Sequence, residues 1–151
     1  MRKYDNLTRL PPTRSYTHIL CAIGTGTMFL GLVRASLPGQ IVIDVPVLKG
    51  VNPLADGQPL TLSPQQSERA RLLDGYHFGG YARHPQELLD FMNEFYRQTA
   101  IPSDFVYTGK LFYAVSDSIR NNYFPASSRL LVIHSGGLQG NASLKPGILQ
   151  F

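Results

Sequence analysis

The sequence lacks several features that mark particular classes of protein. Its 151 residues include a single cysteine, Cys21, so the chain cannot form an internal disulfide and its cysteine usage requires no oxidising compartment. No run approaches the ~20 apolar residues that a membrane helix needs. The polar first ten residues lack the apolar stretch of a signal peptide. We therefore expect a cytoplasmic protein with no membrane segment.

Charged residues are also scarce, at 16% of the chain. The formal net charge is +4, but the lysines and arginines are scattered along the sequence. A nucleic-acid surface needs basic side chains gathered on one face, so we predict no nucleic-acid partner. The histidines show no metal-ligand spacing with one another or with carboxylates, which argues against a zinc site.

The order of apolar runs and turn signals predicts an α/β domain. Residues 1–15 contain adjacent prolines and are predicted to be a linker or a disordered lead-in, whereas residues 16–151 are predicted to form one domain. Short apolar runs predict strands at residues 18–23, 40–48, 76–78 and 130–133. Turn signals and helical periodicity predict helices at residues 28–37, 64–73, 85–99 and 110–121. This order indicates a mainly parallel sheet with helices on both faces.

Two glycine-containing turns follow predicted strands. The Gly24-Thr25-Gly26-Thr27 turn precedes a predicted helix, so its backbone N–H groups and the helix dipole are suited to hold a phosphate; taken alone, such a turn is more often only a tight connection. Ligands of open α/β sheets bind outside the carboxyl ends of the strands. Tyr107, Thr108 and the turn at residues 134–137 are therefore predicted to line one crevice.

Four sequence blocks carry a family resemblance. In chain order they are Gly24-Thr25-Gly26-Thr27, Gly79-Gly80-Tyr81, Val106-Tyr107-Thr108-Gly109-Lys110 and His134-Ser135-Gly136-Gly137. Together they resemble the carboxyl-terminal part of the pyridoxal-phosphate enzymes of the 1-aminocyclopropane-1-carboxylate deaminase and D-cysteine desulfhydrase family, in the order and the tyrosine spacing of that family. The resemblance implies a tryptophan synthase β-like fold, fold type II of these enzymes, of which this chain would form the carboxyl-terminal part of the large domain only.

The resemblance also implies a cofactor, a substrate and roles for residues. The cofactor would be pyridoxal phosphate, and the substrate a small amino acid. Tyr107 would act on the substrate as nucleophile or acid/base, which calls for a phenol of lowered pKa, and Tyr81 would orient the substrate. The residues implied in cofactor binding are Gly24, Thr25, Gly26, Thr27, Thr108, Ser135, Gly136 and Gly137.

Two positions bear on what the family resemblance means for this chain. The deaminases usually carry Glu where this chain has Thr108, and the desulfhydrases usually carry Thr, which favours β-elimination from a D-amino acid over opening of a cyclopropane ring. Relatives often place small or polar residues after the phosphate turn, where this chain has the bulky residues Met28, Phe29 and Leu30. We expect that bulk to weaken phosphate binding.

His134 and Lys110 have competing interpretations. A histidine at the end of a buried strand is most often a hydrogen-bonded structural residue, and we expect this of His134. Lys110 could be mistaken for the Schiff-base lysine of the family, but it belongs to the Val-Tyr-x-Gly-Lys turn motif and is not expected to bind the cofactor covalently.

The family's Schiff-base lysine, in an Asn-Lys-x-Arg-Lys context, has no counterpart in this sequence. We therefore expect the chain to be inactive alone, with the missing amino-terminal half, in the same or another chain, as its partner. The alternative is a non-catalytic remnant or interaction module that retains the sheet. An apolar surface left bare by the missing half predicts a homo-oligomer or an aggregation-prone monomer. A simple nucleotide-binding α/β domain is less well supported, because the chain lacks a Gly-x-Gly-x-x-Gly fingerprint.

Overall fold

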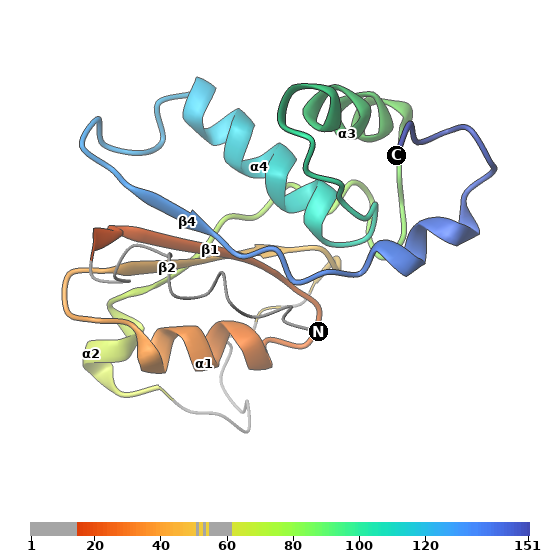
Figure 1. The fold of residues 1–151 in the computed structure, drawn as a ribbon. Helices are drawn as coiled ribbons and strands as arrows, with labels where there is room; N and C mark the ends of the chain where they lie inside the picture. The colour runs from red at the N-terminus through yellow and green to blue at the C-terminus, as the bar shows by residue number, and fades with distance from the viewer. Residues whose placement is uncertain (1–14, 51, 53, 55–61) are drawn as a thin grey trace, which may run out of the picture.

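The computed structural model describes residues 15–50, 52, 54 and 62–151. Within these residues one four-stranded sheet is formed, with strand order β3-β2-β1-β4 and every neighbouring pair parallel (Figure 1). The strands are β1 His18–Ile23, β2 Ile41–Pro46, β3 Ala70–Leu72 and β4 Leu130–Val132. The predicted linker lies outside the described residues apart from residue 15.

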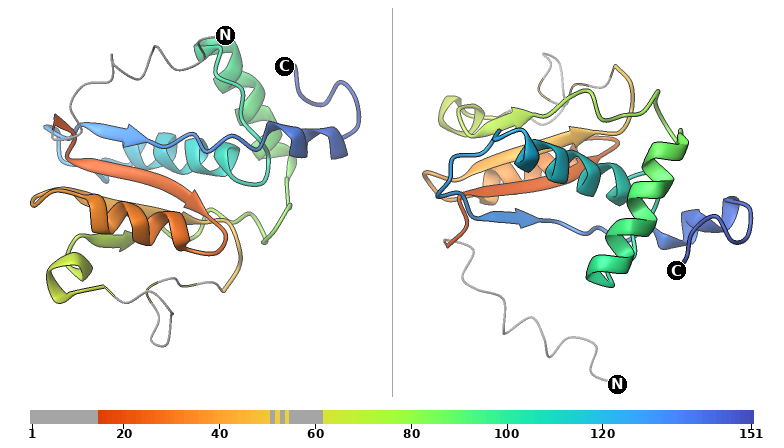
Figure 2. Two further views of the ribbon diagram at one scale, coloured as in Figure 1. Left: turned by 60° about the horizontal axis from the view of Figure 1, so that its bottom comes forward. Right: turned by 90° about the horizontal axis from the view of Figure 1, so that it is seen from above.

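Helices cover both faces of the sheet, as the sequence predicts. Helix α1, Thr27–Ala35, lies on one face and contacts the short α2, Pro64–Ser67. Helix α4, Thr108–Arg120, lies on the other face, and α3, Gln86–Thr99, packs beside the end at which α4 begins (Figure 2). A 3-10 helix, η3, covers Leu138–Ser143.

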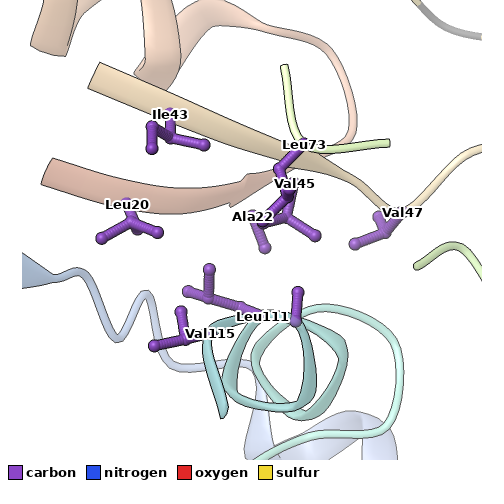
Figure 3. Close-up of a cluster of buried hydrophobic side chains, with 9 residues drawn as sticks. Leu20, Ala22, Ile43, Val45, Val47, Leu73, Leu111 and Val115 are labelled. Atoms are coloured by element: carbon purple, nitrogen blue, oxygen red, sulfur yellow. The ribbon is translucent and has the colours of Figure 1, made fainter. Parts of the chain in front are cut away.

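The two faces of the sheet bury separate apolar clusters, because successive side chains of a strand point to opposite faces. The cluster beneath α4 contains Leu20, Ala22, Ile43, Val45, Val47, Leu73, Leu111, Ala114 and Val115 (Figure 3). The cluster beneath α1 contains Ile19, Cys21, Phe29, Leu30, Val33, Val42 and Ala70. Burial on both faces explains why β1 and β2 are almost continuously apolar, as is typical of parallel strands.

Two predicted elements are wrong. The helix expected at residues 64–73 ends at Ser67, because residues 70–72 pair with β2 as the edge strand β3. Tertiary pairing here overrides local helix signals. The strand expected at residues 76–78 is a turn, and Phe78 has a φ of 53°, which no extended strand accommodates.

The other predicted helices and strands are confirmed, with boundaries that differ from the sequence prediction by a few residues. The strand at residues 18–23 matches at both ends, since glycine follows it directly. The helix predicted from residue 85 to residue 99 begins one residue later. Its strong apolar periodicity places Leu88, Leu89 and Met92 in the interior.

Candidate functional site

A pocket of about 320 Å³ lies beyond the carboxyl ends of β1 and β4. Its walls come from three separate parts of the sequence: the turn after β1, the start of α4 and the segment after β4. The lining residues are Ala22, Gly24, Thr25, Met28, Tyr107, Ser135, Gly136, Gly137 and Gln139. Tyr107 and residues 135–137 of the predicted crevice therefore line one pocket with the turn after β1, whereas Thr108 and His134, which were also predicted there, do not line it.

The first wall of the pocket is the amino-terminal end of α1. Gly26 adopts a φ of 86° as the N-cap, no side chain of the described residues caps the helix, and its first turn contains no acidic residue. The first N–H groups of a helix lack partners inside the helix, and the dipole is positive there, so this end favours an anion. Thr25 and Thr27 are exposed beside it.

The bulky residues after this turn do not all face the pocket. Met28 lines it, but Phe29 and Leu30 are buried in the cluster beneath α1. The expectation that all three residues obstruct the phosphate turn is therefore wrong for Phe29 and Leu30, whose bulk is used in the core. Only Met28 narrows the space next to the turn.

The second wall is the turn that carries Tyr107, and a buried carboxylate organises it. Asp104 Oδ2 accepts hydrogen bonds from the N–H groups of Val106 (2.9 Å) and Tyr107 (2.8 Å), and Oδ1 accepts from the N–H (2.9 Å) and Oγ1 (2.7 Å) of Thr108. The side chain of Asp104 thus satisfies the N–H groups of the turn before α4 and that of Thr108, the first residue of the helix. No role was predicted for Asp104, which lies six positions before the helix predicted from residue 110.

Tyr107 faces the phosphate turn. A β-carbon placed on Gly24 would lie 3.5 Å from Tyr107 Oη, so the phenol oxygen and the turn are neighbours across the pocket. Burial raises the pKa of Tyr107, and the charges of Tyr81 and Asp104 raise it further. The predicted lowering of this pKa is therefore wrong for the described chain. At neutral pH the Tyr107 phenol is protonated and offers a hydrogen-bond donor.

Thr108 and Tyr81 lie outside the pocket lining. Thr108 is fully buried, and its hydroxyl both donates to Asp104 Oδ1 and accepts the N–H of Asp104 at 2.8 Å. Tyr81 is 63% exposed on the loop at residues 77–83, yet close enough for its charge to act on Tyr107. Their roles in cofactor and substrate binding remain predictions.

The third wall is the Ser135-Gly136-Gly137 turn. His134 Nε2 donates to the carbonyl oxygen of Pro102 at 2.8 Å, which leaves Nδ1 to accept the N–H of Gly136 at 3.1 Å. The structural role predicted for His134 is confirmed by these two bonds. Gly137 has a φ of 92°, and a β-carbon on it would lie 3.2 Å from the Asp104 carboxylate, so the second and third walls pack closely.

Lys110 is fully buried and does not line the pocket. Its Nζ donates to the carbonyl oxygens of His77 (2.9 Å) and Gly80 (2.8 Å), in the loop that carries Tyr81. Burial lowers the pKa of Lys110 to about 8, and the negative charge of Asp104 partly opposes that lowering.

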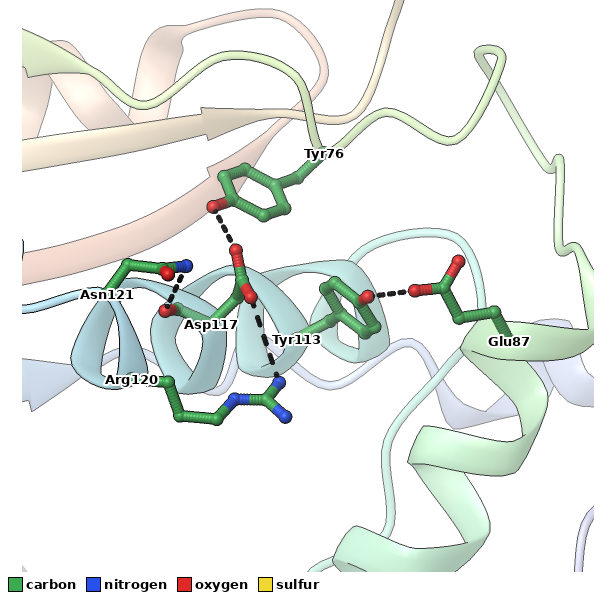
Figure 4. A network of polar contacts seen from close by, with 6 residues as sticks. All are labelled: Tyr76, Glu87, Tyr113, Asp117, Arg120 and Asn121. Atoms are coloured by element: carbon green, nitrogen blue, oxygen red, sulfur yellow. Dashed lines mark hydrogen bonds and ion pairs between the residues drawn. The ribbon is translucent and has the colours of Figure 1, made fainter.

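Two further contacts of α4 hold the segments on either side of the Tyr81 loop (Figure 4). Tyr76 Oη donates to Asp117 Oδ2 at 2.8 Å, before the loop. Tyr113 Oη donates to Glu87 Oε1 in the first turn of α3, after the loop. Hydrogen bonds to α4, the helix that begins at the Tyr107 turn, thus hold the chain on both sides of the Tyr81 loop.

Among the described residues, no three His, Cys, Asp or Glu side chains gather as a metal site. In the same part of the chain, no helix has the length and apolar character needed to cross a membrane.

Comparison with known proteins places this geometry in context. No family model matches the chain. A 73-residue stretch, 48% of the chain, is 38% identical to a 1-aminocyclopropane-1-carboxylate deaminase from Ralstonia pickettii (strain 12J), and it spans 22% of that relative. The crystal structure of an ACC deaminase homologue matches 90% of this chain with a TM-score of 0.66 and 24% identity, over 43% of its own length. The predicted family resemblance and α/β fold are thereby confirmed, whereas the chain spans less than half of either relative.

Proposed function

We propose that this chain, as a relative of the 1-aminocyclopropane-1-carboxylate deaminase family, forms the cofactor-phosphate and tyrosine-bearing portion of a pyridoxal-phosphate-dependent enzyme acting on a small amino acid. The observation that carries the proposal is the pocket itself. It brings Tyr107 together with the turn at Gly24 to Thr27 and with the Ser135–Gly137 wall, although those two turns are more than 100 positions apart along the chain. Both relatives named above point to the same family.

The residues present fit the phosphate of this cofactor. The start of α1 offers uncapped N–H groups, a positive dipole end and the exposed hydroxyls of Thr25 and Thr27, with no acidic side chain in its first turn. The turn at Gly24 to Thr27 would hold the phosphate, and Ser135 to Gly137 would lie beside the ring. When bound, pyridoxal phosphate withdraws electrons from the carbon atoms of an amino-acid substrate.

The chain's own residues would then orient the substrate and supply a proton. Tyr107, held by Asp104 and protonated at neutral pH, would donate a hydrogen bond or a proton from Oη to a group in the pocket. Thr108 brings no carboxylate to this site, which favours a D-cysteine desulfhydrase-like β-elimination over ring opening.

The proposed partner is the remainder of the enzyme, which would supply the Schiff-base lysine. The edge strand β4 supports this arrangement, since Leu130, Leu131 and Val132 are only half-buried, whereas Leu20 and Cys21 in β1 are fully buried. Without that remainder we propose that the chain self-associates through its bare apolar surface. Light scattering tests this proposal, and a monomer that binds no hydrophobic dye would contradict it.

The test of the proposed function is to titrate the purified chain with pyridoxal phosphate and follow its visible spectrum. We expect non-covalent binding, no turnover of D-cysteine, and no specific adduct after borohydride reduction and mass spectrometry. Thr25→Asp puts a negative charge at the anion site and should weaken binding at least ~10-fold, or about 1.4 kcal/mol. Gln65→Glu, which makes the same charge change at an exposed position in α2, should leave binding unchanged.

Three results would contradict the proposal. One is binding that survives Thr25→Asp. The second is a specific reduced adduct on Lys110. The third is elimination activity of the chain alone that Tyr107→Phe abolishes, because the missing lysine would then not be essential.

A further inference from the structure

The loop that carries Tyr81 has an unfavourable backbone. Phe78 and Ala82 have φ values of 53° and 54°, and the glycines between them have φ values of 95° and 125°. Non-glycine residues rarely adopt positive φ, and strained conformations of this kind persist only where the surroundings hold them. Tyr81 itself is 63% exposed, so its own ring is not anchored in the core. Contacts elsewhere must fix the loop.

Lys110 provides the hydrogen bonds that join the loop to α4, beside a ring contact between Phe78 and Tyr113. Its Nζ donates to the carbonyl oxygens of His77 and Gly80 at 2.9 and 2.8 Å. The same two carbonyls accept backbone N–H groups, from Gly80 (3.0 Å) and from Arg83 (3.2 Å). The amine therefore binds two consecutive turns of the loop at once, the second of which contains Tyr81.

This placement of a lysine is costly for the fold. Lysine side chains are almost never fully buried unless paired, and Lys110 has no exposed surface. It also lies in the first turn of α4, where the helix dipole is positive and disfavours a cation. Its two bonded partners are neutral carbonyls, and Asp104 is the acidic group whose charge reaches it. Stability alone gives a poor reason for a lysine here, and a requirement for loop position gives a better one.

Lys110 also has the right place in the chain to connect the two tyrosines. It follows Tyr107 by three residues, so both emerge from the same end of α4, whose backbone Asp104 fixes. We propose that Lys110 is a positioning residue that holds the Tyr81 loop against the Tyr107 turn, so that both phenols face the same small-molecule substrate. The part concerning the substrate rests on the proposed function. The part concerning the two tyrosines stands on the contacts alone.

The test measures how strongly the pKa of Tyr107 depends on Tyr81. The full chain is labelled at tyrosine Cζ and titrated by NMR, and the Tyr107 signal is assigned with Tyr107→Phe. In the wild-type background, Tyr81→Phe should lower the pH at which Tyr107 ionises, because the charge of Tyr81 raises that pKa. In Lys110→Met, Tyr107 should already ionise at lower pH. Adding Tyr81→Phe to that variant should then produce no further change.

Lys49→Met is the matched control. Lys49 is an exposed lysine that borders the same loop, since a β-carbon on Gly80 would lie 3.8 Å from Lys49 Cβ. In Lys49→Met, Tyr81→Phe should lower the pKa of Tyr107 by as much as it does in the wild type. An equal effect in Lys49→Met would show that loss of a lysine near the loop does not by itself remove the dependence of the Tyr107 pKa on Tyr81.

The proposal is overturned if Tyr81→Phe lowers the pKa of Tyr107 by the same amount in the wild-type and Lys110→Met backgrounds. Should Lys110→Met not fold, a second measurement on the wild type decides. The Lys110 amino protons should exchange slowly and show nuclear Overhauser contacts to the Hα atoms of His77 and Gly80, and their absence would also overturn it. Neither measurement uses the cofactor, so a chain that fails to bind pyridoxal phosphate still tests the role of Lys110.

Discussion

The two tyrosines of the candidate site are held in different ways. Tyr107 belongs to a buried turn in which one carboxylate, Asp104, accepts four hydrogen bonds from residues that follow it within four positions. Tyr81 belongs to an exposed loop with four successive or nearly successive positive φ values at residues 78, 79, 80 and 82. That loop is joined to α4 by Lys110, a contact that spans 30 positions of sequence.

This contrast shows which part of the site is encoded locally. The geometry around Tyr107 follows from a short segment and should form whenever α4 forms. The geometry around Tyr81 depends on one buried amine, on the packing of Phe78 against Tyr113, and on the hydrogen bonds that Tyr76 and Glu87 form with α4. We therefore expect the Tyr107 turn to be important for stability and the Tyr81 loop to be important mainly for the site.

Asp104→Ala should have the largest effect on the free energy of unfolding. It leaves three buried N–H groups and a hydroxyl without their acceptor, and unpaired buried donors cost about 1–3 kcal/mol each when nothing relaxes to meet them. With partial relaxation we expect a loss of about 3 kcal/mol or more in urea unfolding. Asp74→Ala, at an exposed position, should change stability by under about 0.5 kcal/mol. Equal effects of the two variants would contradict a special role for the Asp104 turn.

Gly109→Ala should come next, at about 2 kcal/mol of destabilisation in the same assay. A β-carbon on Gly109 would lie 2.8 Å from both the Asp104 carbonyl oxygen and Met92 Sδ, so α4 or α3 must move. Gly31→Ala is the matched helical control, because a β-carbon there meets nothing within 4 Å. Alanine favours helix over glycine, so that variant should be neutral or up to ~1 kcal/mol more stable. Similar losses in both variants would refute the close packing at Gly109.

Lys110→Met should cost only about 1 kcal/mol near pH 7. The carbonyls of His77 and Gly80 keep their backbone donors, and the substitution removes a buried amine whose desolvation opposes folding. The free energies of unfolding of Lys110→Met and Asp104→Ala in urea therefore show which of the two regions is more important for stability. A loss from Lys110→Met as large as that from Asp104→Ala would break the comparison, because the Tyr81 loop would then be as important for stability as the Tyr107 turn.

The smallest expected effect is a pH dependence of the difference in stability between the wild type and Lys110→Met. The pKa of Lys110 is about 8 in the folded chain and near ~10.4 when unfolded, so above pH 8 the unfolded state binds more protons and Lys110 adds stability as pH rises. The stability gap between wild type and Lys110→Met should widen by somewhat under ~1 kcal/mol from about pH 7 to about pH 8.5.

The measurement for this prediction must compare the two proteins at each pH. Burial raises the pKa of Asp44 to about 8, which gives both proteins an opposing slope that cancels in their difference. A gap that stays constant or narrows would contradict the lowered pKa of Lys110.

Much of the framework was predictable, because it rests on patterns that reach few residues along the chain. The apolar run of β1, the glycine turn after it and the periodic apolar face of α3 each specify their own element. The parallel sheet follows from their order. The edge strand β3 was not predictable, since residues 70–72 become a strand only by pairing with β2.

Several residues of the site were predictable, but their contacts and the pKa of Tyr107 were not. Motif spacing identified Tyr107 and both glycine turns, which do meet in one pocket. Motif spacing could not show that the Thr108 hydroxyl is hydrogen-bonded to Asp104, that Phe29 and Leu30 face the core, or that burial raises the pKa of Tyr107. Each of these depends on neighbours brought close by folding. Gln139, which also lines the pocket, had no signal beyond its place after the second glycine turn.

The central claim, that this pocket holds the phosphate end of a pyridoxal cofactor, is tested most directly by amide NMR. The chain would be titrated with pyridoxine 5′-phosphate, which carries the phosphate but no aldehyde to react with surface lysines. We predict that the largest amide shifts fall on the turn from Gly24 to Thr27 and on the turn from Ser135 to Gly137, and that Thr25→Asp removes them. Largest shifts elsewhere, or shifts at these turns that persist in Thr25→Asp, would contradict it.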